Sequence, residues 1–186
     1  MDDLAFIKDY LALYKKSLFE TDISQELVEM KKMLLELKKT GKKVIIAGNG
    51  GSAAMASHVA VDFTKQGGIR TVNFNEADLI TCFANDYGYE HWVAKAVEFY
   101  GDEEDLVVLI SSSGSSKNMV NAAQIATKLG MDVVTFTGFD IDNPLKQEGS
   151  INFWLDSHAY NIVENIHQIW LLMVCDLIIG KVEYSA

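Results

Sequence analysis

The chain has 186 residues, of which 49% are hydrophobic and 23% charged. This is ordinary globular composition, and it predicts one domain with a single sizeable core across residues 1–186. The 26 acidic and 16 basic residues give a net charge of −10. A surface this acidic repels nucleic-acid phosphates, so we expect no direct nucleic-acid partner.

We expect no membrane span, because the longest apolar stretch, residues 166–179, is interrupted by polar side chains. The segment Met1–Leu4 lacks the basic and apolar regions of a secretory signal. The two cysteines, Cys82 and Cys175, lie far apart in apolar surroundings, which is typical of reduced core thiols. These features predict a cytoplasmic protein.

Two amphipathic helices are predicted at the start of the chain. Apolar residues recur at helical spacing from Leu4 to Leu18 and again from Ile23 to Leu37. Asp22 with Gln25 resembles a capping arrangement for the second helix, and Gly41 is a plausible stop. We therefore expect an N-terminal helical extension over residues 1–41.

From Lys43 onward, short apolar runs alternate with helical patterns, which predicts βαβ units and a parallel sheet. The acidic run Asp102–Asp105 between two such elements is interpreted as a solvated turn. The resulting fold is a three-layer, doubly wound α/β fold of the flavodoxin-like type over residues 43–186. The expected strands are residues 44–47, 106–110 and 133–136, with weaker candidates at 71–74 and 151–155, and the expected helices are residues 52–66, 77–85, 90–100, 116–129 and 160–180.

Two loops that follow predicted strands are candidates for ligand binding. In the first, Asn49-Gly50-Gly51-Ser52 opens a helix, and the two glycines let backbone amides approach an anion. No Lys-Ser or Lys-Thr follows, and the Rossmann glycine pattern is absent, so we expect neither a nucleotide nor a flavin. A tight glycine turn without a ligand is the structural alternative.

The second loop, residues 111–116, places five serines around Gly114 at a strand-to-helix turn. Neutral hydroxyl donors and the amides of the next helix together suit a phosphate monoester. The alternative is a surface serine linker, but linkers rarely follow a buried strand and open a helix at once.

These loops, together with Ala84–Gly88 and Thr135–Gly138, resemble the sugar isomerase (SIS) domain family, and specifically its sedoheptulose 7-phosphate isomerase branch. The resemblance covers nearly the whole chain. It implies an isomerase that interconverts an aldose phosphate and a ketose phosphate through an enediol. It also implies a sugar-phosphate ligand and a homotetramer assembled through the terminal helices.

The resemblance also assigns roles to individual residues. It implies that Asn49 and Ser52 contact the sugar or its phosphate, and that Asp86 reaches sugar hydroxyls. The residues that hold the phosphate would be Ser111, Ser112, Ser113 and Ser116.

The metal and acid/base positions of the family differ in this chain. The family binds zinc through a His and a Glu four residues apart, and through a Gln and a His eight residues apart. Here the first pair is His58 and Asp62, the Gln position is Glu164, and the second His position is Leu172. The resemblance thus implies a zinc set of His58, Asp62 and Glu164.

The same comparison implies a catalytic set of Asp62, Glu164 and a replacement acid. Asp62 would act as the base, and His167 or His91 would replace the histidine lost at Leu172. The loss of that histidine keeps a second hypothesis open, a non-catalytic scaffold like the SIS branch that binds the bacterial replication initiator. A flavodoxin-like nucleotide-binding protein ranks lower, because no aromatic pair flanks the serine loop.

Overall fold

The computed structural model describes residues 2–184. Met1, the first residue of the segment that lacks a secretory signal pattern, lies outside these residues. Its centre is a five-stranded, fully parallel sheet in the order β2-β1-β3-β4-β5. This is the predicted flavodoxin-like order. The strands are β1 (Val44–Gly48), β2 (Thr71–Val72), β3 (Leu106–Ser111), β4 (Asp132–Thr137) and β5 (Ile151–Trp154).

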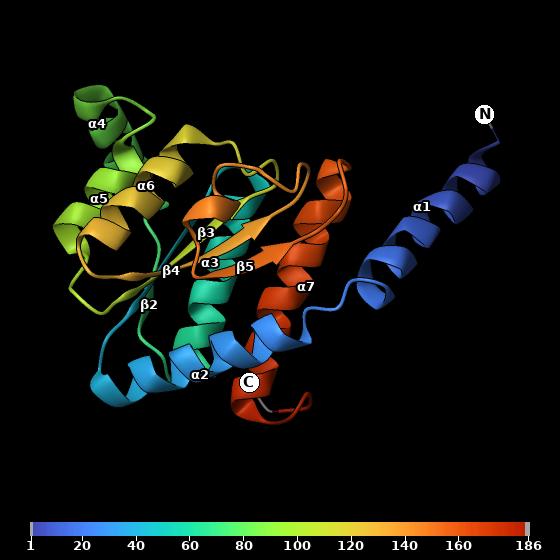
Figure 1. Cartoon of the computed structure of the whole chain (residues 1–186), viewed down its shortest axis with the longest axis horizontal. Coiled ribbons are helices and arrows are strands. Elements are labelled where there is room, and N and C mark those ends of the chain that lie inside the picture. Colours follow the sequence, from blue (N-terminus) through green and yellow to red (C-terminus); the bar gives the residue numbers. More distant parts are fainter. Residues whose placement is uncertain (1, 185–186) are drawn as a thin grey trace.

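Helices cover both faces of the sheet, which confirms the three-layer architecture (Figure 1). Alternate side chains of β1 and β3 point to opposite faces, so Ile46 and Val108 join one core and Ile45 and Val107 join the other. On the first face lie α2 (Ser24–Thr40), α3 (Gly51–Lys65) and α7 (Tyr160–Ile179), and on the second lie α4 (Ala77–Tyr87), α5 (Trp92–Tyr100) and α6 (Lys117–Lys128).

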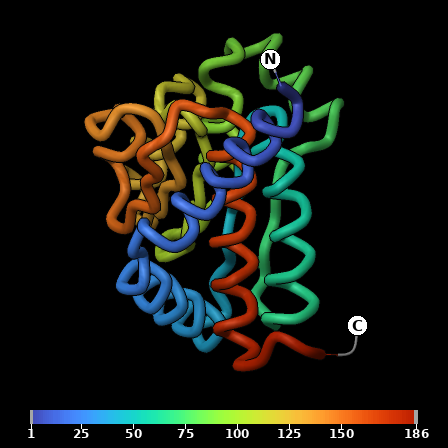
Figure 2. Tube along the Cα trace, turned by 90° about the vertical axis from the view of Figure 1, so that its right-hand side faces the viewer, coloured from blue at the N-terminus to red at the C-terminus, as the bar shows by residue number. Residues whose placement is uncertain are grey.

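The first helix, α1 (Asp3–Phe19), extends away from the sheet beyond α7 (Figure 1). Figure 2 shows it crossing the upper part of α7. Asn165 Nδ2 on α7 donates a hydrogen bond of 2.6 Å to the Tyr14 hydroxyl. Most apolar side chains of α1 nevertheless remain in solvent, with Leu4 77% and Leu11 61% exposed. The helix therefore has an apolar surface that its own chain does not cover.

The helix α7 is long and apolar enough to cross a membrane by length and composition, with a mean hydropathy of 1.6. It packs between α2, α3 and the sheet, and Ile166, Trp170 and Val174 are buried there. Its place in the core accounts for these buried side chains, whereas Ile169 and Met173 on the same helix are exposed.

The helix ends agree with the predicted signals only in part. The Asp22 carboxylate accepts the Ser24 N–H at 3.0 Å, but Ile23 and not Asp22 occupies the N-cap of α2, and no side chain caps the helix there. Gln25 does not complete a capping box, because its amide donates to Glu29. Gly41 ends α2 in the left-handed conformation at φ +71°, as predicted.

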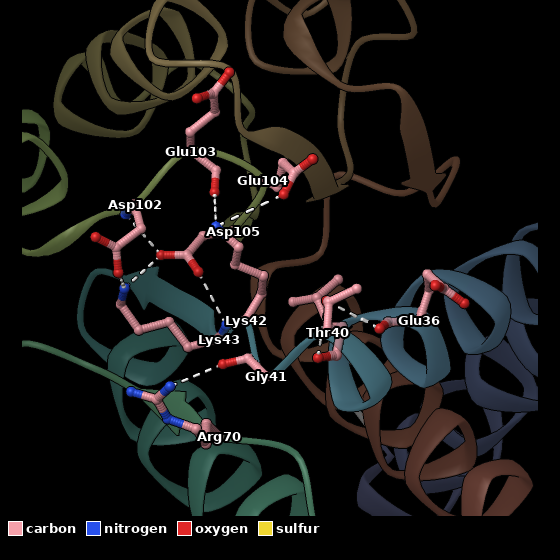
Figure 3. A network of polar contacts seen from close by, with 11 residues as sticks. Glu36, Thr40, Gly41, Lys42, Lys43, Arg70, Asp102, Glu103, Glu104 and Asp105 are labelled. Atoms are coloured by element: carbon pink, nitrogen blue, oxygen red, sulfur yellow. Dashed lines mark hydrogen bonds and ion pairs between the residues drawn. The ribbon is translucent and has the colours of Figure 1, made fainter.

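The acidic run before β3 is solvated as predicted at Asp102, Glu103 and Glu104, but the prediction is wrong for Asp105. Asp105 is 1% exposed, and its carboxylate accepts hydrogen bonds from the Lys43 ammonium and from the Lys43 N–H, the latter at 2.9 Å. Figure 3 shows Asp102 joining the same ammonium. Burial alone would lower the pKa of Lys43, but the hydrogen bonds to both carboxylates outweigh it and raise that pKa. The network joins the starts of β1 and β3.

Two smaller expectations were also wrong. Cys175 is buried as predicted, but Cys82 on α4 is exposed. The edge strand β2 is only two residues long, against the four expected.

Candidate functional site

The two loops singled out in the sequence meet at the carboxyl ends of β1 and β3. The chain order of the sheet reverses between these strands, which is where ligands bind in open parallel sheets. A pocket of about 170 Å³ opens there, and we call it the serine pocket. It is lined by Asn49, Ser52, Ile110, Ser111, Ser112, Ser113, Ser116, Tyr160 and Glu164.

The first loop brings its backbone close to a carboxylate. Gly50 has φ +55°, a conformation that favours glycine. A Cβ on Gly51 would lie 2.5 Å from Glu164 Oε2, so any other residue at this position would displace that carboxylate. The two glycines therefore shape the loop and place Glu164 of α7 against the start of α3.

Asn49 is held in one orientation by two residues that the sequence analysis did not identify. Its side chain and that of Asn118 exchange two amide hydrogen bonds, of 3.1 and 2.8 Å. The Tyr89 hydroxyl donates a third hydrogen bond to Asn49 Oδ1 at 3.1 Å. This fixed amide lies on the pocket wall, where it can present its remaining N–H to a ligand oxygen.

The second loop supplies hydroxyls and helix amides together. Ser111 Oγ donates to Ser116 Oγ at 3.1 Å, and Ser116 occupies the N-cap of α6 without capping it through its side chain. The first amides of α6 are thus left for another acceptor. Ser112 Oγ is buried and has no hydrogen-bond partner within residues 2–184. A buried hydroxyl that lines a pocket in this way points to a ligand.

His58 and Asp62 lie beyond the serine pocket, on the side of α3 that faces α7. His58 Nε2 is 3.3 Å from Asp62 Oδ2, which confirms that the pair shares one helix face. Gln168 Nε2 lies 3.4 Å from His58 Nδ1. Gln168 follows Glu164 by one helical turn, a spacing that signals a shared face, yet the sequence analysis missed it.

The three residues proposed to bind zinc do not converge. Glu164 lies over Gly51, whereas His58 lies two turns further along α3 beside Gln168. Within residues 2–184, no three His, Cys, Asp or Glu side chains are close enough to hold a metal ion. The donor set of this chain does not fit the zinc site implied by the resemblance, so we derive no step through a metal.

His167 does not reach the pocket, so the catalytic role predicted for it does not agree with its position. It is fully buried, and its Nε2 donates to the Thr137 carbonyl oxygen at 3.0 Å. Burial lowers its pKa to about 4, although the hydrogen bond to Thr137 opposes the change. The imidazole therefore stays neutral and acts as a structural donor in the core.

Two other candidates also lie away from the pocket. Asp86 is exposed at the end of α4, where it accepts a hydrogen bond from Asn85 Nδ2 at 2.9 Å. His91 is exposed just before α5, 3.3 Å from the Asn121 amide. Neither residue lines the serine pocket of its own chain.

Comparison with known proteins agrees with this geometry. Residues 6–138 match the family profile of the SIS domain. A phosphoheptose isomerase of Fusobacterium nucleatum is 32% identical, over 98% of this chain and 94% of that protein. One of Helicobacter pylori is also 32% identical, over 96% and 95% of the two chains. The solved structure of a phosphoheptose isomerase from Francisella tularensis has a TM-score of 0.90 at 25% identity, and covers 97% of this chain and all of that one.

The fold and the pocket define a doubly wound α/β protein with a polar pocket at its topological switch point. The chain belongs to the SIS domain family, and it resembles phosphoheptose isomerases over nearly all of its length.

Proposed function

We propose that this SIS protein is an aldose–ketose isomerase for phosphosugars of the phosphoheptose type. One observation carries the proposal: two strand-end loops form a single pocket of hydroxyls and amides, and the Ser112 hydroxyl in it is buried without a partner. The phosphate group would occupy this pocket. The relatives that align over nearly the whole chain are named isomerases, so the non-catalytic scaffold is not favoured.

The packing of α3 beside α7 defines a direction in which a bound sugar would extend. Glu164 contacts Gly51 and Gln168 contacts His58, so the two helices run side by side in the same direction from the pocket. Seven residues of helix separate Gly51 from His58, about 10 Å along the axis. An extended sugar held by its phosphate would place its far end, where the carbonyl lies, beside His58 and Asp62.

The His58–Asp62 pair would move the protons of the reaction. A base removes the proton from the carbon next to the carbonyl while the carbonyl oxygen gains a proton, which gives the enediol. The base then returns its proton to the former carbonyl carbon, and the hydroxyl on the other carbon gives its proton back to the donor as the new carbonyl forms. Asp62, adjacent to His58 Nε2, supplies the carboxylate base, and His58 supplies a proton donor for the carbonyl oxygen. Glu164, on the pocket wall, would accept hydrogen bonds from the sugar hydroxyls nearer the phosphate.

The test compares Asp62→Asn with Ser112→Ala by steady-state kinetics and calorimetry with sedoheptulose 7-phosphate. We expect Asp62→Asn to lower kcat by about 100-fold or more, because it removes the base but leaves the distant phosphate contacts intact. Ser112→Ala should weaken binding by about tenfold, since it removes a hydroxyl donor to a charged group.

Asp78→Asn, on the exposed first turn of α4, is the matched control and should leave both constants unchanged. Wild-type protein that binds sedoheptulose 7-phosphate without converting it would support the scaffold instead. Wild-type protein that binds no phosphosugar would overturn both readings of the pocket.

A homotetramer and a cytoplasmic location are two further parts of the proposal, and the uncovered apolar surfaces support the first of them. A groove of about 650 Å³ runs along α7, and Ile169, Leu172 and Met173 line it with Lys31 and Lys181 at its rim. The exposed face of α1 carries both apolar side chains and Asp2, Asp3 and Asp9. Such a face would cover the groove of a second copy through its apolar side chains.

A further inference from the structure

An aromatic side chain stands at the mouth of the serine pocket without a role in the function proposed so far. Tyr160 is the first residue of α7, lines the pocket, and remains 57% exposed. Glu164 follows it by one helical turn and lines the same wall. If the serines bind the anionic group of a ligand, the Tyr160 ring contacts the part of the ligand next to that group.

The Tyr160 ring is held by a stack of side chains outside the pocket. Phe139 meets it edge to face, with ring centroids 4.9 Å apart. The other neighbour of Phe139 is His158, whose ring is stacked at 4.9 Å and 24°. His158 Nε2 is in turn 3.3 Å from Asp140 Oδ1. These contacts restrict where the Tyr160 ring can lie.

The backbone beneath this stack is strained and tied to the serine loop. Phe139 has φ +55°, a left-handed conformation that is unfavourable for a side chain other than glycine. Its N–H donates to the Ser157 carbonyl at 3.0 Å, and the Gly138 N–H donates to the Ser112 carbonyl at 2.9 Å. Strain of this kind persists where the surroundings fix it, often beside a ligand site.

We propose that Tyr160 is a substrate contact, whose ring forms the wall on which the carbon chain of the phosphosugar packs. Phe139 is a positioning residue that holds the ring there. This inference rests on the proposed function and assigns separate parts of the ligand to separate residues of the pocket. The serines recognise the phosphate, and Tyr160 distinguishes a phosphosugar from a free phosphate ion.

The experiment measures the affinity of two probes, sedoheptulose 7-phosphate and inorganic phosphate, for the full chain. We expect Tyr160→Ala to weaken phosphosugar binding by about tenfold, because the apolar wall is lost, and to change phosphate binding by less than about twofold. Tyr160→Phe keeps the ring and should bind both probes nearly as the wild type does. Tyr100→Ala, on an equally exposed tyrosine at the end of α5, is the control.

A second variant separates positioning from folding. Phe139→Gly removes the ring and relieves the left-handed strain, so we expect no loss in the unfolding midpoint but a several-fold loss of phosphosugar affinity. Loss of both would show that Phe139 acts only through stability.

The outcomes distinguish this inference from the proposed function. If the wild type binds phosphosugar and Tyr160→Ala binds it equally well, the inference is overturned and the proposed function stands. An equal loss for both probes would also overturn it, because Tyr160 would then act on the phosphate cradle. If the wild type binds no phosphosugar, the proposed function itself fails.

Discussion

Ser112 Oγ and His167 Nδ1 are two of the four buried side-chain polar atoms that lack a hydrogen-bond partner within residues 2–184, and their surroundings differ. Ser112 lines the serine pocket, where a ligand oxygen can satisfy it. His167 is packed against the rings of Phe136 and Trp170, with centroids 5.8 and 5.9 Å away. Ser112 Oγ is therefore open to a ligand. Burial of His167 makes the stability of the fold depend on pH.

The pKa of His167 predicts a loss of stability in acid. It falls to about 4 in the folded chain from its ordinary 6.5, so the unfolded chain binds the extra proton first as the pH decreases. The contribution of the neutral imidazole is complete above pH 6.5 and is lost between about pH 6.5 and 4. The loss over this range should approach 3 kcal/mol.

Urea unfolding at pH 7 and pH 4.5 checks this expectation. His167→Gln keeps an N–H donor for the Thr137 carbonyl but does not titrate, so its stability should fall less in acid than that of the wild type. His91→Gln, at an exposed position, should behave like the wild type. Equal acid sensitivity of His167→Gln and wild type would contradict the buried neutral imidazole.

His167 was predicted to replace the histidine lost at Leu172, and it lies three residues after Glu164 in the sequence. Three residues turn a helix by about 300°, which points His167 into the core, whereas the fourth, Gln168, lies on the side facing His58. The serine loop was predictable because all its hydroxyl groups lie in one short segment. The hydrogen bonds of Asn118 and Tyr89 to Asn49 join distant segments, and no local pattern reveals them.

At the scale of elements, the sheet was predictable where strands are buried on both faces. The continuous apolar runs of β1, β3 and β4 reflect that burial and gave bounds within one residue of those observed. The edge strand β2 pairs through only Thr71 and Val72, too few residues to produce a pattern. The burial of Asp105 depends on Lys43, which is 62 residues away, so its own acidic neighbourhood suggested the opposite.

The buried ion pair of Lys43 and Asp105 predicts that a single substitution lowers the free energy of unfolding substantially. We expect Asp105→Asn to lower the free energy of unfolding by about 2 to 3 kcal/mol, because it leaves the buried Lys43 ammonium poorly paired. Equilibrium unfolding in urea at pH 7 measures the difference. Glu104→Gln makes the same chemical change one residue earlier, where the side chain is 75% exposed, and should cost less than about 0.5 kcal/mol. Similar values for the two variants would show that the pair adds nothing.

At the scale of the whole molecule, the uncovered apolar faces lie on α1 and in the groove along α7. Leu4, Leu11 and Phe19 are each more than 60% exposed, and Leu172 lines the groove where the family has a histidine. Monomeric proteins rarely leave contiguous apolar surface of this kind in water. The two surfaces are therefore the places where assembly should be tested.

We expect Leu11→Asp to reduce the mass of the particle in sedimentation velocity, because it places a charge in the apolar face of α1. The fold itself should survive, since Leu11 is 61% exposed in the single chain. Lys15→Glu, at an exposed polar position of the same helix, should leave the mass unchanged. Assembly that is unaffected by Leu11→Asp would remove α1 from the interface.

The salt bridge of Lys43 and Asp105 and the serine loops occupy opposite ends of the same strands β1 and β3. The ion pair fixes the relative position of β1 and β3 where the strands begin. The pocket-lining side chains follow where the strands end. Substitutions in the two pocket loops can therefore change which ligand is bound, because the ion pair that stabilises the strands lies at their other end. New specificities can evolve here without a new fold.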